Sequence, residues 1–163
     1  MPIVKNGKII EDAWILVGDD EAVPLAASVI VSLTRWQTER GTLIGRNGPL
    51  GVRLASGDLA EIIATDLKYL DLIAVEFPAI GDGRGYSIGR LLRQRCGFTG
   101  ELRAIGPLVR DVFPFLHRCG FDAMEARDEI EAAAWHEAVG AITVAYQPAT
   151  AAGPRLRHAV PPS

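Results

Sequence analysis

Short runs of apolar, often β-branched residues recur along the chain and are separated by longer amphipathic stretches. Six such runs lie at residues 28–33, 50–54, 71–77, 101–105, 121–124 and 142–146. Runs of this length without polar alternation are typical of strands buried on both faces of a parallel sheet. Most of their starts are about 20 to 30 residues apart, which is the scale of a strand followed by a crossover helix. The pattern therefore predicts repeated strand–helix units.

The number of these units limits the fold class to α/β with a mostly parallel sheet. Six strands are too few for a closed barrel of eight strands, so an open doubly wound sheet and a partial barrel remain as alternatives. The spacing alone does not choose between them. We predict a single domain over residues 1–147, followed at 148–163 by a flexible tail rich in proline and alanine.

The first seventeen residues carry a different signal. Asn6-Gly7 separates two apolar pairs, Ile3-Val4 and Ile9-Ile10. Asn-Gly between apolar pairs is a strong short-range signal of a two-residue hairpin turn. We therefore predict a small antiparallel hairpin attached to the main sheet, continued by residues 14–17.

Capping signals mark the start of two helices. Asp58 and Glu61 have the spacing of a capping box, which predicts a helix that continues to residue 70. Pro107 suits the first turn of a helix over residues 107–119. Pro114 lies inside that helix and is predicted to bend it or to shorten its first half.

Positive charge is concentrated in one part of the chain. The net charge is −3, but residues 84–118 carry +5 and the remainder carries −8. Arginine outnumbers lysine by fourteen to three, and the arginine fork is suited to carboxylates, phosphates and sulfur oxyanions. This segment is either a solvated helix face with weak surface ion pairs or a contact surface for acidic groups. Its arginines are Arg84, Arg90, Arg93, Arg95, Arg103, Arg110 and Arg118.

Several functional classes lack their sequence signals. No apolar run approaches the length of a membrane span, the first residues do not resemble a signal peptide, and the acidic net charge disfavours nucleic acid as a partner. Cys96 and Cys119 are too few for a disulfide framework, and neither they nor the histidines have metal-ligand spacing. No nicotinamide, flavin, haem or iron–sulfur motif is present. We therefore predict a cytoplasmic protein without a cofactor or bound metal.

One glycine-rich loop is the best candidate binding site. It follows the apolar run that ends at residue 77 and opens a predicted helix, so it is expected at the carboxyl end of a strand, where α/β proteins usually bind ligands. Its glycines let a ligand approach the backbone, and a helix start presents free N–H groups to an anion. The alternative is a tight turn in which the aspartate caps the helix and the arginine is simply exposed. The candidate residues are Asp82, Gly83, Arg84, Gly85, Tyr86 and Ser87.

Charged residues near this loop are the supporting candidates. Glu76, at the end of the preceding strand, is interpreted first as the partner of an arginine on a neighbouring strand, Arg53 or Arg103, and second as a general acid or base. Arg90, Arg93 and Arg118 complete the arginine-rich surroundings. No catalytic residue is predicted.

Several strings of residues point to a known family. The two most specific are Asp82-Gly83-Arg84-Gly85-Tyr86-Ser87 and Arg118-Cys119-Gly120-Phe121-Asp122. The others are Gly51-Val52-Arg53-Leu54, Glu76-Phe77-Pro78, Leu91-Leu92-Arg93, Glu101-Leu102-Arg103-Ala104-Ile105-Gly106 and Tyr146-Gln147. From the N-terminal hairpin to about residue 148, the chain resembles a bacterial family of unknown function whose members are described as probable oxidoreductases of sulfite reduction.

The resemblance implies a role rather than a reaction. Members of that family are typically encoded beside the sulfite reductase haemoprotein and other genes of sulfate assimilation, and no catalytic residues carry over. The leading hypothesis is an accessory protein that binds sulfite reductase or its acidic electron donor through the arginine-rich segment. A second hypothesis is a small enzyme or sensor that binds an oxyanion, phosphate or nucleotide at residues 82–87. A third is a scaffold whose task is to form homo-oligomers.

Overall fold

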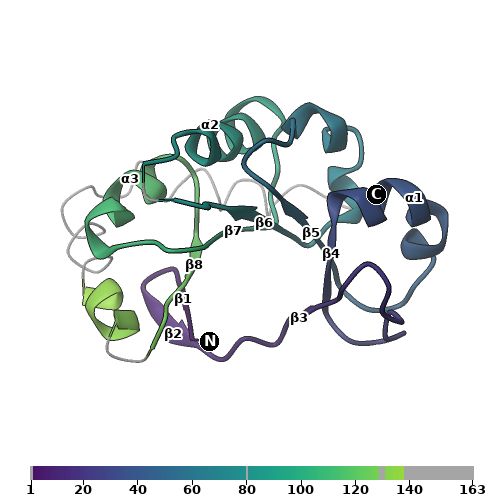
Figure 1. Cartoon of the computed structure of the whole chain (residues 1–163), viewed down its shortest axis with the longest axis horizontal. Helices are drawn as coiled ribbons and strands as arrows, with labels where there is room; N and C mark the ends of the chain where they lie inside the picture. The colour runs from purple at the N-terminus through teal and green to yellow at the C-terminus, as the bar shows by residue number, and fades with distance from the viewer. Residues whose placement is uncertain (1, 80, 129–130, 138–163) are drawn as a thin grey trace.

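The computed structural model describes residues 2–79, 81–128 and 131–137. It shows a curled sheet of eight strands in the order β2-β1-β8-β7-β6-β5-β4-β3, with helices covering its convex face (Figure 1). The strand predicted at 142–146 and the tail predicted at 148–163 lie outside the described residues. The strands are β1 (Ile3–Lys5), β2 (Lys8–Ile10), β3 (Ile15–Leu16), β4 (Val29–Ser32), β5 (Leu50–Leu54), β6 (Leu72–Glu76), β7 (Glu101–Ile105) and β8 (Ala123–Glu125).

Strand order decides between the two predicted architectures. The strands β3 to β8 are parallel and lie in the sheet in the order in which they occur in the chain. Because every crossover is of the same hand and advances in the same direction, the connecting segments fall on one face of the sheet. The sheet therefore curls into a half-barrel, which confirms the mostly parallel α/β class and selects the partial barrel over the doubly wound sheet.

The N-terminal segment is confirmed in part. β1 and β2 form the predicted antiparallel hairpin, with Asn6 and Gly7 at positive φ of 49° and 79° in its turn. β1 then adds antiparallel to β8. The prediction that residues 14–17 continue this hairpin is wrong. They form β3, which pairs in parallel with β4 at the opposite edge, since the amide of Ile15 and that of Val17 donate to carbonyls of residues 28 and 30.

The helices are shorter than the sequence predicts. They include α1 (Leu33–Ile44), α2 (Arg84–Arg90), which continues as the π-helical turn η3 (Leu91–Arg95), and α3 (Phe113–Arg118), with 3₁₀ turns η1 (Ala60–Ile63), η2 (Leu67–Tyr69) and η4 (Arg110–Val112). Residues 131–137 are helical as well. Pro114 lies in the first turn of α3, which confirms that it shortens the helix. Among the described residues, no helix has the length and apolar character needed to cross a membrane.

Two of the predicted helix starts are wrong. Asp58 does not cap a helix, because its carboxylate accepts from the amide of Ala55 at 2.7 Å and closes a turn, leaving only the short η1 and η2. No helix starts at Pro107, because the preceding Gly106 has φ +122° and turns the chain, and the amide of Leu108 bonds back to the carbonyl of Gly106. In both places a local side-chain or backbone bond competes with the helix.

The two faces of the sheet have different environments. The main core lies between the convex face and the helices, where Trp36, Phe77 and Phe121 are buried. The concave face carries a smaller apolar cluster of Ile30, Leu72 and Ala74. Figure 1 shows the segment between β2 and β3 crossing this concave side from one edge of the sheet to the other.

Candidate functional site

The loop of residues 82–87 lies where the sequence predicts, at the carboxyl end of β6 and at the start of α2. Asp82 accepts from the backbone amide of Arg84 at 3.0 Å and binds its guanidinium at 3.0 and 2.7 Å. These bonds from Arg84 hold the pKa of Asp82 well below its usual range. The Arg84 side chain is 63% exposed. The fork of Arg84 is therefore occupied by a carboxylate of its own loop. This is a tight turn, as in the predicted alternative, but the N-cap of α2 is Gly83 and Arg84 is exposed and ion-paired.

The prediction that Gly85 is exposed to a ligand is wrong. Gly85 is buried, and a Cβ at this position would lie 2.5 Å from the ring of Phe77. The ring of Tyr86 also packs on Phe77, with centroids 5.0 Å apart. Gly85 is thus required for the close approach of α2 to the sheet, whereas Gly83 and Ser87 are exposed.

Glu76 pairs with an arginine of a neighbouring strand, which was the first of the two interpretations of this residue from the sequence. Its carboxylate lies 3.9 Å from the Arg53 guanidinium, and both side chains are 38% exposed. An ion pair at this distance and exposure contributes little to stability. Arg103 is not its partner.

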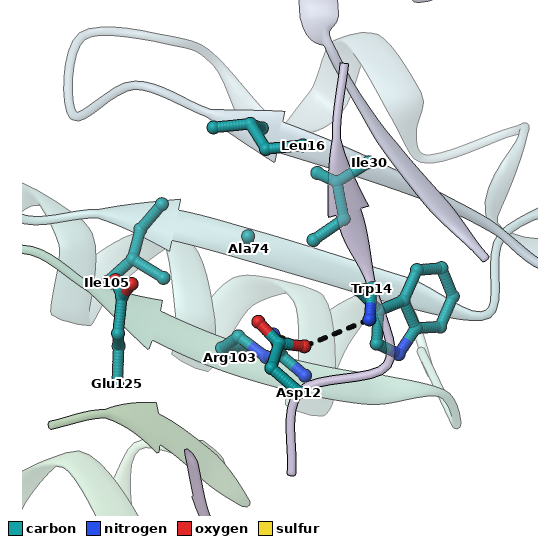
Figure 2. Close-up of a pocket in the computed structure, with 8 residues that line it drawn as sticks. All are labelled: Asp12, Trp14, Leu16, Ile30, Ala74, Arg103, Ile105 and Glu125. Carbon is teal, nitrogen blue, oxygen red and sulfur yellow. Dashed lines mark hydrogen bonds and ion pairs between the residues drawn. The ribbon is translucent and has the colours of Figure 1, made fainter. Parts of the chain in front are cut away.

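Two of the supporting arginines are structural. Arg103 is 2% exposed and lies on the concave face beside Asp12 (Figure 2). Its guanidinium binds Asp12 at 2.9 Å and Glu101 at 2.7 Å. Arg93 donates to the backbone carbonyls of residues 98, 100 and 120 and pairs with Asp122 at 3.3 Å. These two side chains hold loops and strands together and are not free to bind a partner.

Three other arginines face outward from the helical layer. Arg90, Arg95 and Arg118 are exposed, and none forms an ion pair with an acid in the described part of the chain. The Arg118 guanidinium lies 5.7 Å from the centre of the Phe115 ring. We call the surface formed by Ser87, Arg90, Gln94, Arg95, Phe115 and Arg118 the arginine face.

Contacts between α2 and α3 join the parts of this face. The Phe115 ring is 40% exposed and stacks on Tyr86 of α2, with centroids 4.6 Å apart. The Arg90 guanidinium reaches across to the Sγ atom of Cys119, at 3.5 Å. α3, which carries Arg118, is therefore packed against α2, which carries Arg90.

The arginine face contains a shallow groove. It has a volume of about 210 Å³ and is lined by Ser87, Arg90, Leu91, Gln94 and Arg95. The chain here changes from α-helical to π-helical hydrogen bonding, with the amide of Cys96 bonded to the carbonyl of Leu91 at 3.0 Å. Such π turns are frequent at functional sites. Two guanidinium groups, a hydroxyl and an amide in one groove suit a carboxylate or another oxyanion.

Sequence reasoning identified Ser87 as a loop candidate and Arg90, Arg95 and Arg118 as part of the basic segment, but it missed Gln94 and Phe115 as members of this face. A helical projection of residues 87–95 would place Ser87, Arg90 and Gln94 together. The position of Arg95 depends on the π turn, and that of Phe115 on the packing of α3 against Tyr86. Neither has a sequence signal.

Within residues 2–79, 81–128 and 131–137 no group of three or more histidine, cysteine, aspartate and glutamate side chains is placed to hold a metal ion. The exposed arginines of the arginine face offer charge recognition of anionic groups.

Comparison with protein-family models matches residues 51–156 to a family described as "bacterial protein of unknown function (DUF934)". The match covers the loop of residues 82–87, both helices of the arginine face, strands β6 to β8, and β5 apart from Leu50. No curated protein and no solved structure matches the chain.

Proposed function

We propose that this chain, which belongs to the bacterial DUF934 family of proteins of unknown function, is an accessory protein that docks an acidic partner on its arginine face. The partner that we propose is assimilatory sulfite reductase or its acidic electron donor. The link to sulfite reduction rests on the sequence resemblance described above. One observation supports the choice of docking surface. Three exposed arginines that have no acidic partner in the described chain lie beside a groove or an exposed aromatic ring.

Charge and shape both support a protein partner for this face. Arginine and aromatic residues are enriched at the centres of protein interfaces, where they contribute most of the binding energy. Complementary charge also accelerates association and selects acidic partners over basic ones. Because Arg90, Arg95 and Arg118 have no acid to satisfy them in the described chain, an incoming carboxylate does not have to displace an internal partner.

The loop of residues 82–87 is the weaker alternative site for a small oxyanion. An anion there would compete with Asp82 for the Arg84 fork, and Asp82 is held in place by three bonds from Arg84. The replacement Arg84→Ala separates the two sites. If the arginine face is the site, this replacement leaves partner binding unchanged, because Arg84 already has an internal partner.

The experiment that tests the proposal is a calorimetric titration of the purified chain with purified sulfite reductase and, separately, with its electron donor. We expect binding to one of the two at low salt that weakens as the salt concentration rises. The triple replacement Arg90→Glu, Arg95→Glu and Arg118→Glu should weaken that binding at least about tenfold, because each attractive contact becomes repulsive.

A control variant carries the same change in net charge elsewhere on the surface. Lys8, Lys68 and Arg127 are also exposed and lie outside the arginine face, so their replacement by glutamate should have a much smaller effect on affinity. Equal weakening by both triple variants would mean that only net charge matters. No binding of either protein by the unmodified chain would refute the proposal.

A further inference from the structure

A small hollow lies on the concave face of the sheet, on the side opposite to the arginine face (Figure 2). The segment that joins β2 to β3 crosses this face (Figure 1), and two of its residues, Asp12 and Trp14, line the hollow. Its volume is about 80 Å³, the space of two or three water molecules at ~30 Å³ each. It therefore suits a ligand of only a few heavy atoms.

One side of the hollow is apolar. Leu16, Ile30, Ala74 and Ile105 line it from four different strands. Ala74 lies on the central strand β6 and is 1% exposed. Figure 2 shows open space over Ala74, between Ile30 and Ile105. The small side chain at residue 74 is thus what leaves the hollow unfilled.

The other side of the hollow is charged and carries an excess of negative charge. Arg103 is already bound by the carboxylates of Glu101 and Asp12, and Glu101 also binds Lys5 at 2.9 Å. Glu125 lines the same hollow and has no hydrogen bond or ion pair within the described residues. Among the described side chains, three carboxylates thus accompany two cations, and Glu125 is the carboxylate without a hydrogen bond or ion pair.

The surroundings of Glu125 oppose its charge. Burial raises the pKa of its carboxyl group, and the Arg103 guanidinium offsets part of that rise. A half-buried carboxylate without a donor is costly, and a ligand that supplies a cationic donor would remove that cost. Trp14 lines the hollow as well, and an indole ring attracts cations when they lie over its face.

We propose that this hollow is a binding site for a small primary ammonium group on a short apolar stem. The ammonium group donates to Glu125, with Asp12 near it, and the stem lies over Ala74 between Ile30 and Ile105. A metal ion is disfavoured, because no group of three or more metal-ligating side chains is placed for one among the described residues. This site is independent of the proposed docking of an acidic partner.

Titration of the full chain with ethylammonium, followed by ¹H–¹⁵N chemical shifts, tests this proposal. Ethanol and acetate at the same ionic strength serve as the neutral and anionic probes of similar size. We expect saturable shifts of the Trp14 indole N–H and of amides in β6, β7 and β8 with ethylammonium only. Trp14→Phe identifies the indole signal.

Two replacements remove the site in different ways. Glu125→Gln keeps the shape and removes the charge, and should weaken ethylammonium binding about 10- to 100-fold, the range of one charged hydrogen bond. Ala74→Val keeps every charge and fills the hollow, and should abolish the saturable shifts. Any one of three results would overturn the proposal. Acetate binds more strongly than ethylammonium, the shifts with ethylammonium do not saturate, or the folded Glu125→Gln protein binds ethylammonium as well as the unmodified protein does.

Discussion

Replacement of Arg103 by methionine is expected to lower the free energy of unfolding by about 3–5 kcal/mol, the cost of removing one partner from a buried ion pair. Methionine replaces the unbranched stem of arginine as far as the Nε position, so the packing of the stem is largely kept while the charge is lost. The Glu101 side chain is only 7% exposed and, among the described residues, keeps only Lys5 as an ionic partner, while Asp12 loses the one cation that pairs with it there. Urea unfolding followed by circular dichroism measures this change.

Two further variants show whether uncompensated charge is the cause. Adding Glu101→Gln to Arg103→Met should restore part of the lost stability, because one of the two stranded carboxylates is removed. Arg95→Met is the matched exposed case and should leave the unfolding midpoint close to that of the unmodified protein, because Arg95 is exposed and forms no ion pair within the described residues. A loss below about 1 kcal/mol in Arg103→Met would mean that the concave ion-pair network is solvated.

Replacement of Gly106 by alanine is the second change with a large expected effect. Gly106 ends β7 at φ +122°, a conformation that side chains disfavour, and a Cβ there would overlap the carbonyl oxygen of Phe77. That carbonyl belongs to the backbone of the neighbouring connection, so it cannot move aside cheaply. Strain at this φ and the overlap each cost roughly 1–3 kcal/mol, and we expect a loss of about 3 kcal/mol or more in unfolding free energy.

Gly83→Ala is the control for this replacement. Gly83 has φ −79°, which alanine adopts freely, and no atom lies within 4 Å of its Cβ position. The free energy of unfolding of the Gly83→Ala protein should stay within about 1 kcal/mol of that of the unmodified protein. Equal stability of the two alanine variants in urea would contradict the backbone geometry at the carboxyl end of β7.

Most of the sheet could be predicted from the sequence, because its strands are consecutive apolar runs. The predicted run at 50–54 coincides with β5, and that at 101–105 with β7. The position of residues 14–17 could not be predicted, since an apolar segment pairs equally well with either open edge of a sheet. The crossing of the concave face by the preceding segment decides this, and it depends on tertiary contacts such as Arg103 with Asp12.

The candidate site was predicted less completely. The alternation of side chains places Arg53, Glu76 and Arg103 on one face of the sheet, but only the three-dimensional structure shows that Glu76 meets Arg53 and that Arg103 meets Glu101 and Asp12. A glycine pattern does not distinguish a ligand site from close packing, and Gly85 serves packing. The sequence identifies the arginines of the arginine face as possible contacts for acidic groups. It does not show that they have no acidic partner among the described residues.

Growth on sulfate as the sole sulfur source tests the central claim most directly. In a source bacterium that lacks this chain, the unmodified protein is compared with the Arg90→Glu, Arg95→Glu, Arg118→Glu variant and with the charge-matched Lys8→Glu, Lys68→Glu, Arg127→Glu variant, all at equal abundance. If the arginine face docks the machinery of sulfite reduction, the first variant fails to restore growth on sulfate, the control variant restores it, and cysteine supports all strains. Full growth on sulfate with the arginine-face variant, or in the strain that lacks the chain, would contradict the account.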